Sequence, residues 1–308
     1  YTRLTFIVQN SINKNKMKIL ITGGSGLLGQ YLNSSLSSNH NVLSLYYSNV
    51  GNCKNYNSLK INVCNYNSIL TAFKDFRPDA VIHAAAMSHP ILPAGISSKD
   101  VYDLNVNSTK NIAELCDKFN SKLIYTSTDL VYAGYRGSML KENAKLIPVS
   151  LYAETKLMGE IKIQQTFDNY IILRTAILFG LGINHSKNHF HQMYLDLQNG
   201  NPVNLFTDQY RTPLSLNEAA RIINEIVSFD VKSEVINFGG LGRVSRYELG
   251  ERLCEIAKLN KNLLVKIKMD DVPGLQKVED VSMNTDKLQS LGIKQKSLDE
   301  MILEIVTK

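Results

Sequence analysis

A glycine-rich turn between a short apolar run and a helical run constrains this chain more than any other feature. Residues 17–22 read Met-Lys-Ile-Leu-Ile-Thr, and the chain then passes Gly23, Gly26 and Gly29 before a helical run to Leu36. Strand, tight turn and helix in this order suit a dinucleotide pyrophosphate, because the positive end of the helix attracts the anion. Gly23 permits the turn, Gly26 lets backbone N–H groups approach the phosphates, and Gly29 lets helix pack on strand.

Apolar runs of strand length recur along the chain and alternate with helical runs. They lie at 41–46, at 80–86, where the strand opens into a small-residue turn, and at 122–127, 170–175 and 234–238. Such alternation predicts an α/β fold with a Rossmann-type doubly wound parallel sheet. With 308 residues the chain exceeds the usual size of one domain. We expect an NAD(P)-binding domain at 17–180 and, at 181–308, mainly a smaller C-terminal substrate-binding region, whose strand at 234–238 returns to the main sheet.

Composition argues for an ordinary globular protein without a nucleic-acid partner. The formal net charge is +6, and Arg3, Lys14 and Lys16 supply +3 of it before any acidic residue, which leaves 6 − 3 = +3 for the rest. No stripe of Arg and Lys with interleaved aromatics is present. Residues 1–16 are expected to be a disordered extension, an upstream translation or an expression remnant.

The cysteines and apolar runs indicate a cytoplasmic protein. The four cysteines are widely spaced and form no Cys-x-x-Cys pair, as expected of reduced thiols: Cys53, Cys64, Cys116 and Cys254. No apolar run approaches the ~20 residues of a membrane span. His185, His189 and His191 cluster, but no carboxylate or cysteine completes a ligand set, so no metal site is predicted.

Tyr152 and Lys156 are the candidate chemical centre. They stand four residues apart in a run that predicts a helix over 150–167, so both side chains lie on one helix face. A nearby ammonium favours the phenolate, so Lys156 is expected to lower the pKa of Tyr152. Thr128 ends a predicted buried strand and adds a hydroxyl that can bind the same substrate oxygen. By itself, a Tyr/Lys pair at this spacing also fits the solvent-exposed face of a helix. Here a nucleotide-binding loop and a strand that ends in a hydroxyl residue precede the pair, and this order favours a catalytic role.

Several motifs together resemble a known family. The glycines are spaced G-x-x-G-x-x-G, residues 127–131 read Ser-Thr-Asp-Leu-Val, and 148–160 read Pro-x-Ser-x-Tyr-x-x-x-Lys-Leu-x-Gly-Glu. With this pattern the chain resembles the extended short-chain dehydrogenases/reductases, and within them the dTDP-4-dehydrorhamnose reductases. The resemblance covers 17–308 and is strongest in 17–180.

The resemblance implies that hydride passes from NADPH to the C4 ketone of a nucleotide-linked 4-keto-6-deoxy sugar. Tyr152 would protonate the forming alkoxide, Lys156 would also hold the nicotinamide ribose, and Thr128 would orient the ketone. Asp129 would hydrogen-bond the substrate, or else cap its loop. Arg211 stands where glycine is common in the related Asp-Gln-x-Gly-x-Pro loop; it would grip a diphosphate or form a surface salt bridge.

The cofactor expectation rests on the glycine turn, the strand ends and the resemblance. The stretch 46–49 reads Tyr-Tyr-Ser-Asn, without the carboxylate that selects NAD, so NADP(H) is favoured and NAD(H) is allowed. The residues expected to contact the cofactor are Gly23, Ser25, Gly26, Leu27, Leu28, Gly29, Tyr47, Asn62, Val63, Ala84, Ala85, Ala86, Asn105, Tyr152 and Lys156.

Alternatives to this function remain open. Related sugar-nucleotide dehydratases carry a glutamate where this chain has Leu130, which cannot abstract a proton, so dehydration is disfavoured. The β subunit of methionine adenosyltransferase shares the fold and much of the pattern, so an NADP-binding regulatory subunit is a rival. A third possibility is reduction of a different ketone or aldehyde. Relatives often dimerise through helices that include the Tyr/Lys one, so a homodimer is also expected.

Overall fold

The protein is described here by a computed structural model that covers residues 16–88, 95–135 and 137–307. The expectation for residues 1–16 therefore lies outside the described residues, except for Lys16.

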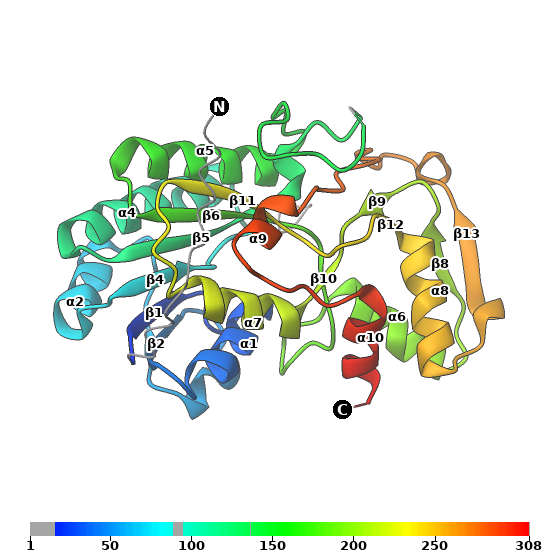
Figure 1. Cartoon of the computed structure of the whole chain (residues 1–308), viewed down its shortest axis with the longest axis horizontal. Coiled ribbons are helices and arrows are strands. Elements are labelled where there is room, and N and C mark those ends of the chain that lie inside the picture. Colours follow the sequence, from blue (N-terminus) through cyan, green and yellow to red (C-terminus); the bar gives the residue numbers. More distant parts are fainter. Residues whose placement is uncertain (1–15, 89–94, 136, 308) are drawn as a thin grey trace, which may run out of the picture.

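A seven-stranded sheet with the order β11-β6-β5-β4-β1-β2-β3 forms the centre of the molecule (Figure 1). Every neighbouring pair in it is parallel. Its strands are β1 (Lys18–Thr22), β2 (Asn41–Tyr46), β3 (Ser58–Lys60), β4 (Ala80–His83), β5 (Lys122–Thr128), β6 (Tyr170–Thr175) and β11 (Glu234–Phe238). The strand order reverses between β1 and β4, where a crevice opens in folds of this class.

Helices cover both faces of the sheet (Figure 1). One face carries α1 (Leu27–Leu36) and α7 (Leu216–Ile226), and the other carries α2 (Tyr66–Phe76), α4 (Ser108–Phe119) and α5 (Leu151–Thr166). Alternate residues of each central strand face opposite sides: in β5, Ile124 belongs to the first core, while Leu123 and Tyr125 belong to the second. The Rossmann-type doubly wound fold predicted from the sequence is confirmed.

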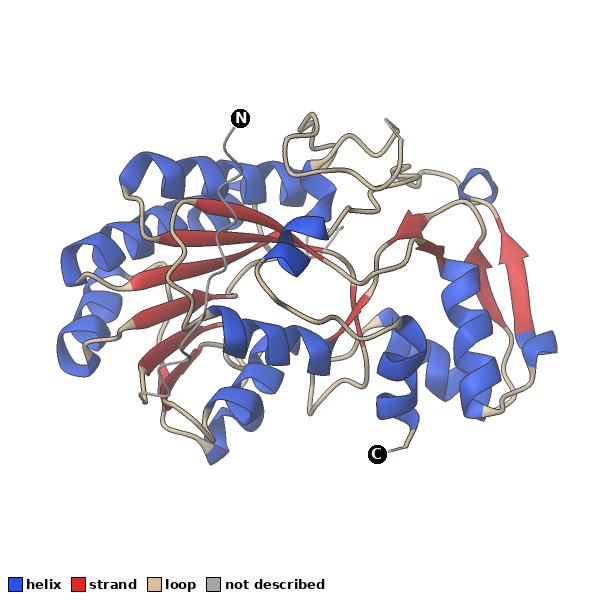
Figure 2. Ribbon diagram, viewed as in Figure 1, coloured by secondary structure: helices blue, strands red, loops and turns tan. Residues whose placement is uncertain are grey.

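The remaining elements gather beside the sheet around short paired strands, as the ribbon in Figure 2 shows. These strands pair as β7 (Leu178–Phe179) with β10 (Leu214–Ser215), β9 (Tyr210–Arg211) with β12 (Val244–Ser245), and β8 (Val203–Phe206) with β13 (Leu264–Ile267). Of the remaining helices, α6 (His189–Gln198), α8 (Arg246–Ala257) and α10 (Leu298–Val306) pack in this region, whereas α3 (Ser98–Tyr102) contacts α5 and α9 (Asp286–Ser290) contacts β11. β11 follows α7 and pairs with β6 at the edge of the main sheet.

Side-chain caps determine where several of these helices begin. Ser150 accepts a hydrogen bond from the Ala153 backbone N–H and so starts α5 two residues before Tyr152. Reciprocal capping boxes start α8 at Ser245 and α10 at Ser297, as their Ser-x-x-Glu spacing predicts. At α7, the Ser215 side chain accepts a hydrogen bond from the Glu218 backbone N–H and so caps the helix. The Glu218 carboxylate accepts a hydrogen bond from Arg221 and does not return one to Ser215.

Candidate active site

The glycine turn after β1 brings its backbone into close contact with the end of β4. Gly23 has a φ of +69°, and a Cβ there would lie 2.7 Å from the Ala85 backbone nitrogen. A Cβ on Gly29 would overlap the carbonyl oxygen of Gly23 and the backbone of Gly24. Side chains at either position would separate helix from strand, so both glycines are required by packing.

A groove of about 650 Å³ runs from this turn along the ends of β2 and β3. Of the residues expected to contact a cofactor, it is lined by Gly23, Ser25, Gly26, Tyr47, Asn62, Val63, Ala84, Ala85 and Ala86. Ser48 and Asn49 also line it, and no Lys or Arg is among its described lining residues. The described charged residues that line it are Asp100 and Asp103, and the uncharged residues 46–49 where β2 ends are polar enough to hydrogen-bond a ribose.

A second cavity, of about 460 Å³, adjoins the groove and shares Gly26, Ala84 and Ala86 with it. It lies where β1, β4, β5 and β6 end. The predicted residues that line it include Leu27, Leu28, Thr128, Asp129, Tyr152, Lys156 and Arg211. The structure therefore brings the phenol, the ammonium and the threonine hydroxyl together, although they lie on separate elements.

The Tyr152 phenol faces Thr128 and Asp129. Burial and the Asp129 carboxylate raise the pKa of Tyr152 to about 12, and a hydrogen bond with Thr128 opposes this rise. The expected lowering of the Tyr152 pKa below its usual value is wrong, since the net shift is upward. The physical reason is that desolvation and a neighbouring anion both disfavour phenolate.

The Lys156 ammonium lies over the ring of Tyr125, 3.9 Å from its centroid. Lys156 is 1% exposed, and burial lowers the pKa of its amine to about 7, while the Glu160 carboxylate opposes this shift. At neutral pH the amine is thus poised between its two protonation states. The sequence did not indicate this contact with Tyr125.

Arg211 does not adopt either of its expected roles. It is buried, and its terminal nitrogens donate to the carbonyl oxygens of Tyr210, Val278 and Glu279. Its Nε lies 3.8 Å from Oδ2 of Asp129. Because the backbone already occupies the ends of the guanidinium, Arg211 holds the 278–279 segment in place; it neither lies on the surface nor offers its fork to a diphosphate.

Asp129 and Arg246 supply polar groups of this cavity whose hydrogen-bonding capacity is only partly used. Oδ2 of Asp129 is buried without a hydrogen-bond partner in the described structure, and burial raises the pKa of this carboxyl. Arg246 lines the same cavity and donates from Nε to Gln209 at 2.9 Å. Burial and the neighbouring Arg211 lower its pKa to about 10. Two guanidiniums beside one carboxylate give this end of the cavity a positive balance.

Sequence reasoning missed Arg246, although a signal was present. It is the first residue of α8, directly after the cap Ser245. A cation at a helix N-terminus opposes the helix dipole, so an arginine at this position indicates a role other than helix stability.

A buried ion pair lies below the cavity and joins α5 to β6. Arg174 contacts Glu160 at 2.8 Å, with both side chains at most 5% exposed. Ser127 donates to Glu160 at 2.5 Å, and Arg174 also donates to the Tyr132 hydroxyl at 3.0 Å. This network fixes α5 against β5 and β6, and so fixes the helix that carries Tyr152.

Asn105 and His83 serve the scaffold instead of the cavities. Asn105, expected to contact the cofactor, uses its amide on Met87 and Thr155 and lines neither cavity. His83 is fully buried between Thr22 and Thr109, and burial lowers its pKa to about 3. Because both of its ring nitrogens are bonded, His83 is a packed and neutral histidine.

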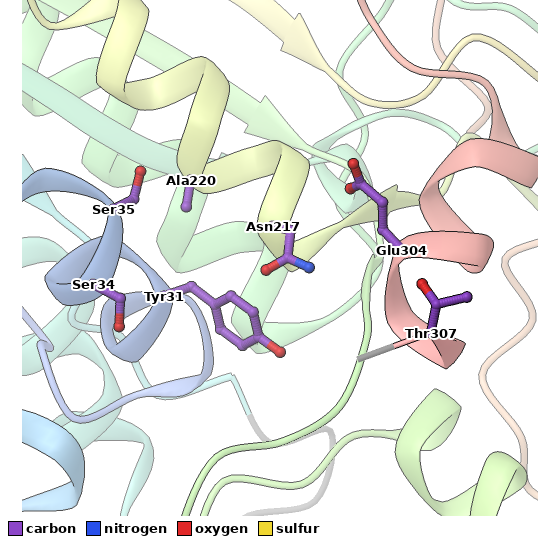
Figure 3. Close-up of a pocket in the computed structure, with 7 residues that line it drawn as sticks. All are labelled: Tyr31, Ser34, Ser35, Asn217, Ala220, Glu304 and Thr307. Atoms are coloured by element: carbon purple, nitrogen blue, oxygen red, sulfur yellow. The ribbon is translucent and has the colours of Figure 1, made fainter.

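Figure 3 shows a different hollow, between α1, α7 and α10. Its volume is about 450 Å³, and among the described residues Glu304, which is paired with Lys296, is the one charged residue that lines it. No residue expected to take part in chemistry points into it. Elsewhere, within 16–88, 95–135 and 137–307, no three His, Cys, Asp or Glu side chains gather as a metal site requires. None of the helices in these ranges is long and apolar enough to span a bilayer.

The fold and the site together define an extended short-chain dehydrogenase/reductase. The chain belongs to the family of the RmlD substrate binding domain, whose model matches residues 17–308. The resemblance inferred from the motifs is thereby confirmed.

Similar proteins include reductases and regulatory subunits. The chain is 26% identical over 224 residues to a dTDP-4-dehydrorhamnose reductase of Aggregatibacter actinomycetemcomitans, covering 72% of this chain and 71% of the relative. It is 24% identical over 300 residues to the methionine adenosyltransferase 2 subunit beta of Pongo abelii, covering 94% and 87%. The fold superposes with a TM-score of 0.81 on the dTDP-4-dehydrorhamnose reductase of Bacillus anthracis in complex with NADP, at 20% identity and 95% and 99% coverage.

Proposed function

We propose that this protein reduces the C4 ketone of a nucleotide-linked 4-keto-6-deoxy sugar. The observation that carries the proposal is the convergence of Thr128, Tyr152 and Lys156 in one cavity beside the dinucleotide groove. NADP(H) is the favoured cofactor, with NAD(H) as a possible one, and when bound it supplies the hydride. The glycine cradle fits such a nucleotide, and residues 46–49 at the end of β2 carry no carboxylate against a 2′-phosphate, while Asp100 and Asp103 line another part of the groove.

Tyr152 is proposed as the proton donor. With its pKa raised to about 12, the phenol keeps its proton at neutral pH, yet it is still far more acidic than the alcohol formed from the ketone. Proton transfer to the forming alkoxide is therefore downhill. Thr128 orients the ketone oxygen, and a protonated Lys156 stabilises the phenolate that remains.

Asp129 and Arg246 are proposed to bind the substrate. Oδ2 of Asp129, which has no hydrogen-bond partner in the described structure, would accept a hydrogen bond from a sugar hydroxyl, since a buried acceptor without a hydrogen bond is costly. Arg246, whose terminal nitrogens have no hydrogen-bond partner among the described residues, would contact the diphosphate in place of Arg211.

The proposed function is tested by following NADPH absorbance with a panel of 4-keto-6-deoxy sugars that differ in their nucleotide. We expect oxidation of NADPH that depends on the sugar and yields the C4 alcohol. Other ketones and aldehydes serve as the comparison panel. Faster turnover with one of those would assign a different carbonyl substrate, and no turnover with any compound would contradict a reductase.

The rate of reduction is expected to fall as the pH rises through about 7. Burial lowers the pKa of Lys156 to about 7, so the ammonium is present below this pH and lost above it. Because the charged amine stabilises the phenolate, kcat/KM for reduction should be high on the acidic side and decline on the basic side. A pH profile measured with Lys156→Arg should lack this decline, since arginine keeps its charge. An identical decline in both proteins would assign it to another group.

Cofactor binding is expected to protect Cys64 from thiol reagents. Cys64 is exposed and lines the groove, whereas Cys53, Cys116 and Cys254 are buried. Partial burial and Asp103 raise the pKa of Cys64, so labelling should be slow and should accelerate with rising pH. Mass spectrometry after alkylation should find one modified cysteine, and NADPH should suppress it. Unchanged labelling at saturating NADPH would place the nucleotide elsewhere.

An NADP-binding regulatory subunit is the second candidate, because the methionine adenosyltransferase 2 β subunits align over 94% of this chain. Co-purification with a methionine adenosyltransferase, together with absence of NADPH turnover, would favour it. The division into domains at residue 180, a homodimer and a cytoplasmic location stay predictions.

A further inference from the structure

Strand β5 presents two polar contacts to helix α5, one turn of helix apart. Tyr125 and Ser127 point to the same face of the sheet because they are two residues apart in a strand. Tyr125 meets Lys156, and Ser127 meets Glu160, which follows Lys156 by four residues. Strand β5, as well as helix α5, therefore positions the side chain of Lys156.

The Tyr125 side chain is held firmly in this position. It is fully buried, and its hydroxyl lies 3.4 Å from the Lys156 carbonyl oxygen. The absence of a side chain at Gly159 makes room for this hydroxyl, since a Cβ there would overlap it. The His83 ring lies 5.5 Å away, on the neighbouring strand β4. The ring is thus wedged between β4, β5 and α5 and has no room to turn aside.

The other charged or titratable groups around Lys156 provide only part of its counter-charge. On α5, the Glu160 carboxylate favours the charged amine, but it is shared with Arg174 and Ser127. On β4, His83 is neutral because burial lowers its pKa to about 3. Tyr152, also on α5, keeps its proton because its pKa is raised to about 12. The negative face of the Tyr125 ring is therefore the group in direct contact with the ammonium.

We propose that Tyr125 is a positioning residue of the active site, whose ring holds the ammonium of Lys156 in place and favours its charged form. The inference rests on the proposed function for its catalytic consequence, but the contact itself does not depend on substrate. The aromatic ring carries the role, and the hydroxyl is secondary.

The test compares Tyr125→Phe, which keeps the ring, with Tyr125→Leu and Tyr125→Met, which remove it. Tyr170→Leu serves as the matched control, because Tyr170 belongs to the same buried cluster on β6 but is not the ring over Lys156. In NMR spectra of protein labelled at lysine ε-carbons, the Lys156 protons should be shifted upfield by the ring and should titrate near pH 7. Lys156→Arg assigns the resonance.

We expect Tyr125→Phe and Tyr170→Leu to retain the upfield shift and the midpoint. Tyr125→Leu and Tyr125→Met should lose the shift and lower the midpoint by roughly one pH unit, a tenfold change in the protonation equilibrium. Their kcat/KM for reduction should match the wild type well below the new midpoint and fall about tenfold above pH 7. A merely structural defect would lower the rate equally at every pH.

Three results would overturn the proposal: no upfield shift in the wild type, an unchanged midpoint in Tyr125→Leu, or loss of the shift in Tyr125→Phe. If a variant does not fold, the wild-type spectrum still tests the proposal, because absence of the upfield shift there would overturn it. The spectrum needs neither sugar nor cofactor. A protein that shows the ring-shifted lysine but never oxidises NADPH would refute the proposed function alone, and turnover without the shift would refute the role of Tyr125 alone.

Discussion

Replacing Tyr152 by phenylalanine is expected to lower kcat for ketone reduction about 10²–10⁴-fold, the usual contribution of a positioned proton donor. The reason is that the phenol is the group in the cavity that Thr128 hydrogen-bonds and that still carries its proton at neutral pH. Affinity for NADPH should change little, because the glycine cradle and the groove are untouched. Stopped-flow oxidation of NADPH and fluorescence titration measure the two quantities separately.

The control for this experiment is Tyr66→Phe, which removes a hydroxyl from the surface of α2. It should leave kcat and NADPH affinity at the wild-type values. Equal rates for wild type and Tyr152→Phe would show that the proton comes from another group. A loss of NADPH affinity as large as the loss of kcat would indicate a disturbed groove and not a missing proton.

Breaking the buried ion pair between Glu160 and Arg174 is expected to lower the free energy of unfolding by about 3–5 kcal/mol. In Arg174→Met the Glu160 carboxylate stays buried with only Ser127 as a donor, so an uncompensated charge remains inside the protein. Urea denaturation measures the effect. The double variant Glu160→Leu with Arg174→Met should recover much of the loss, because it buries no charge.

The matched control is the exposed pair Lys110–Glu114 on α4, with side chains 50% and 43% exposed. Glu114→Gln should cost less than about 0.5 kcal/mol, since solvent screens such a pair. A loss in Arg174→Met no larger than this would show that the buried network does not hold α5. The position of Tyr152 would then have to depend on the apolar core.

Much of the fold follows from local sequence. The run 17–22 followed by Gly23, Gly26 and Gly29 specifies a strand, a turn and a helix within a few residues of chain. The strand predicted at 234–238 has the same first and last residues as β11. A short run that contains Val, Ile and Phe favours a partly buried strand. The cap Ser150 likewise sets the start of the helix that carries Tyr152 and Lys156.

From the sequence, the candidate site could be predicted only as a set of residue types that follow one another in a given order along the chain. Thr128 and Tyr152 were expected to meet at one substrate oxygen, because a nucleotide loop and a strand that ends in a hydroxyl residue precede the Tyr/Lys helix. The direction of the Tyr152 pKa shift was not predictable. It depends on burial and on the Asp129 carboxylate, and both are properties of the assembled cavity.

By itself, the sequence determined the order of strands and helices, the glycine cradle and the identity of the phenol, ammonium and hydroxyl, since these depend on near neighbours along the chain. Only the tertiary structure decided that Arg211 bonds to backbone carbonyls, that Arg246 enters the cavity, and that Lys156 lies over the Tyr125 ring. The physical reason is that hydrogen-bond partners, desolvation and cation–π contacts depend on distances in space between residues far apart in the chain.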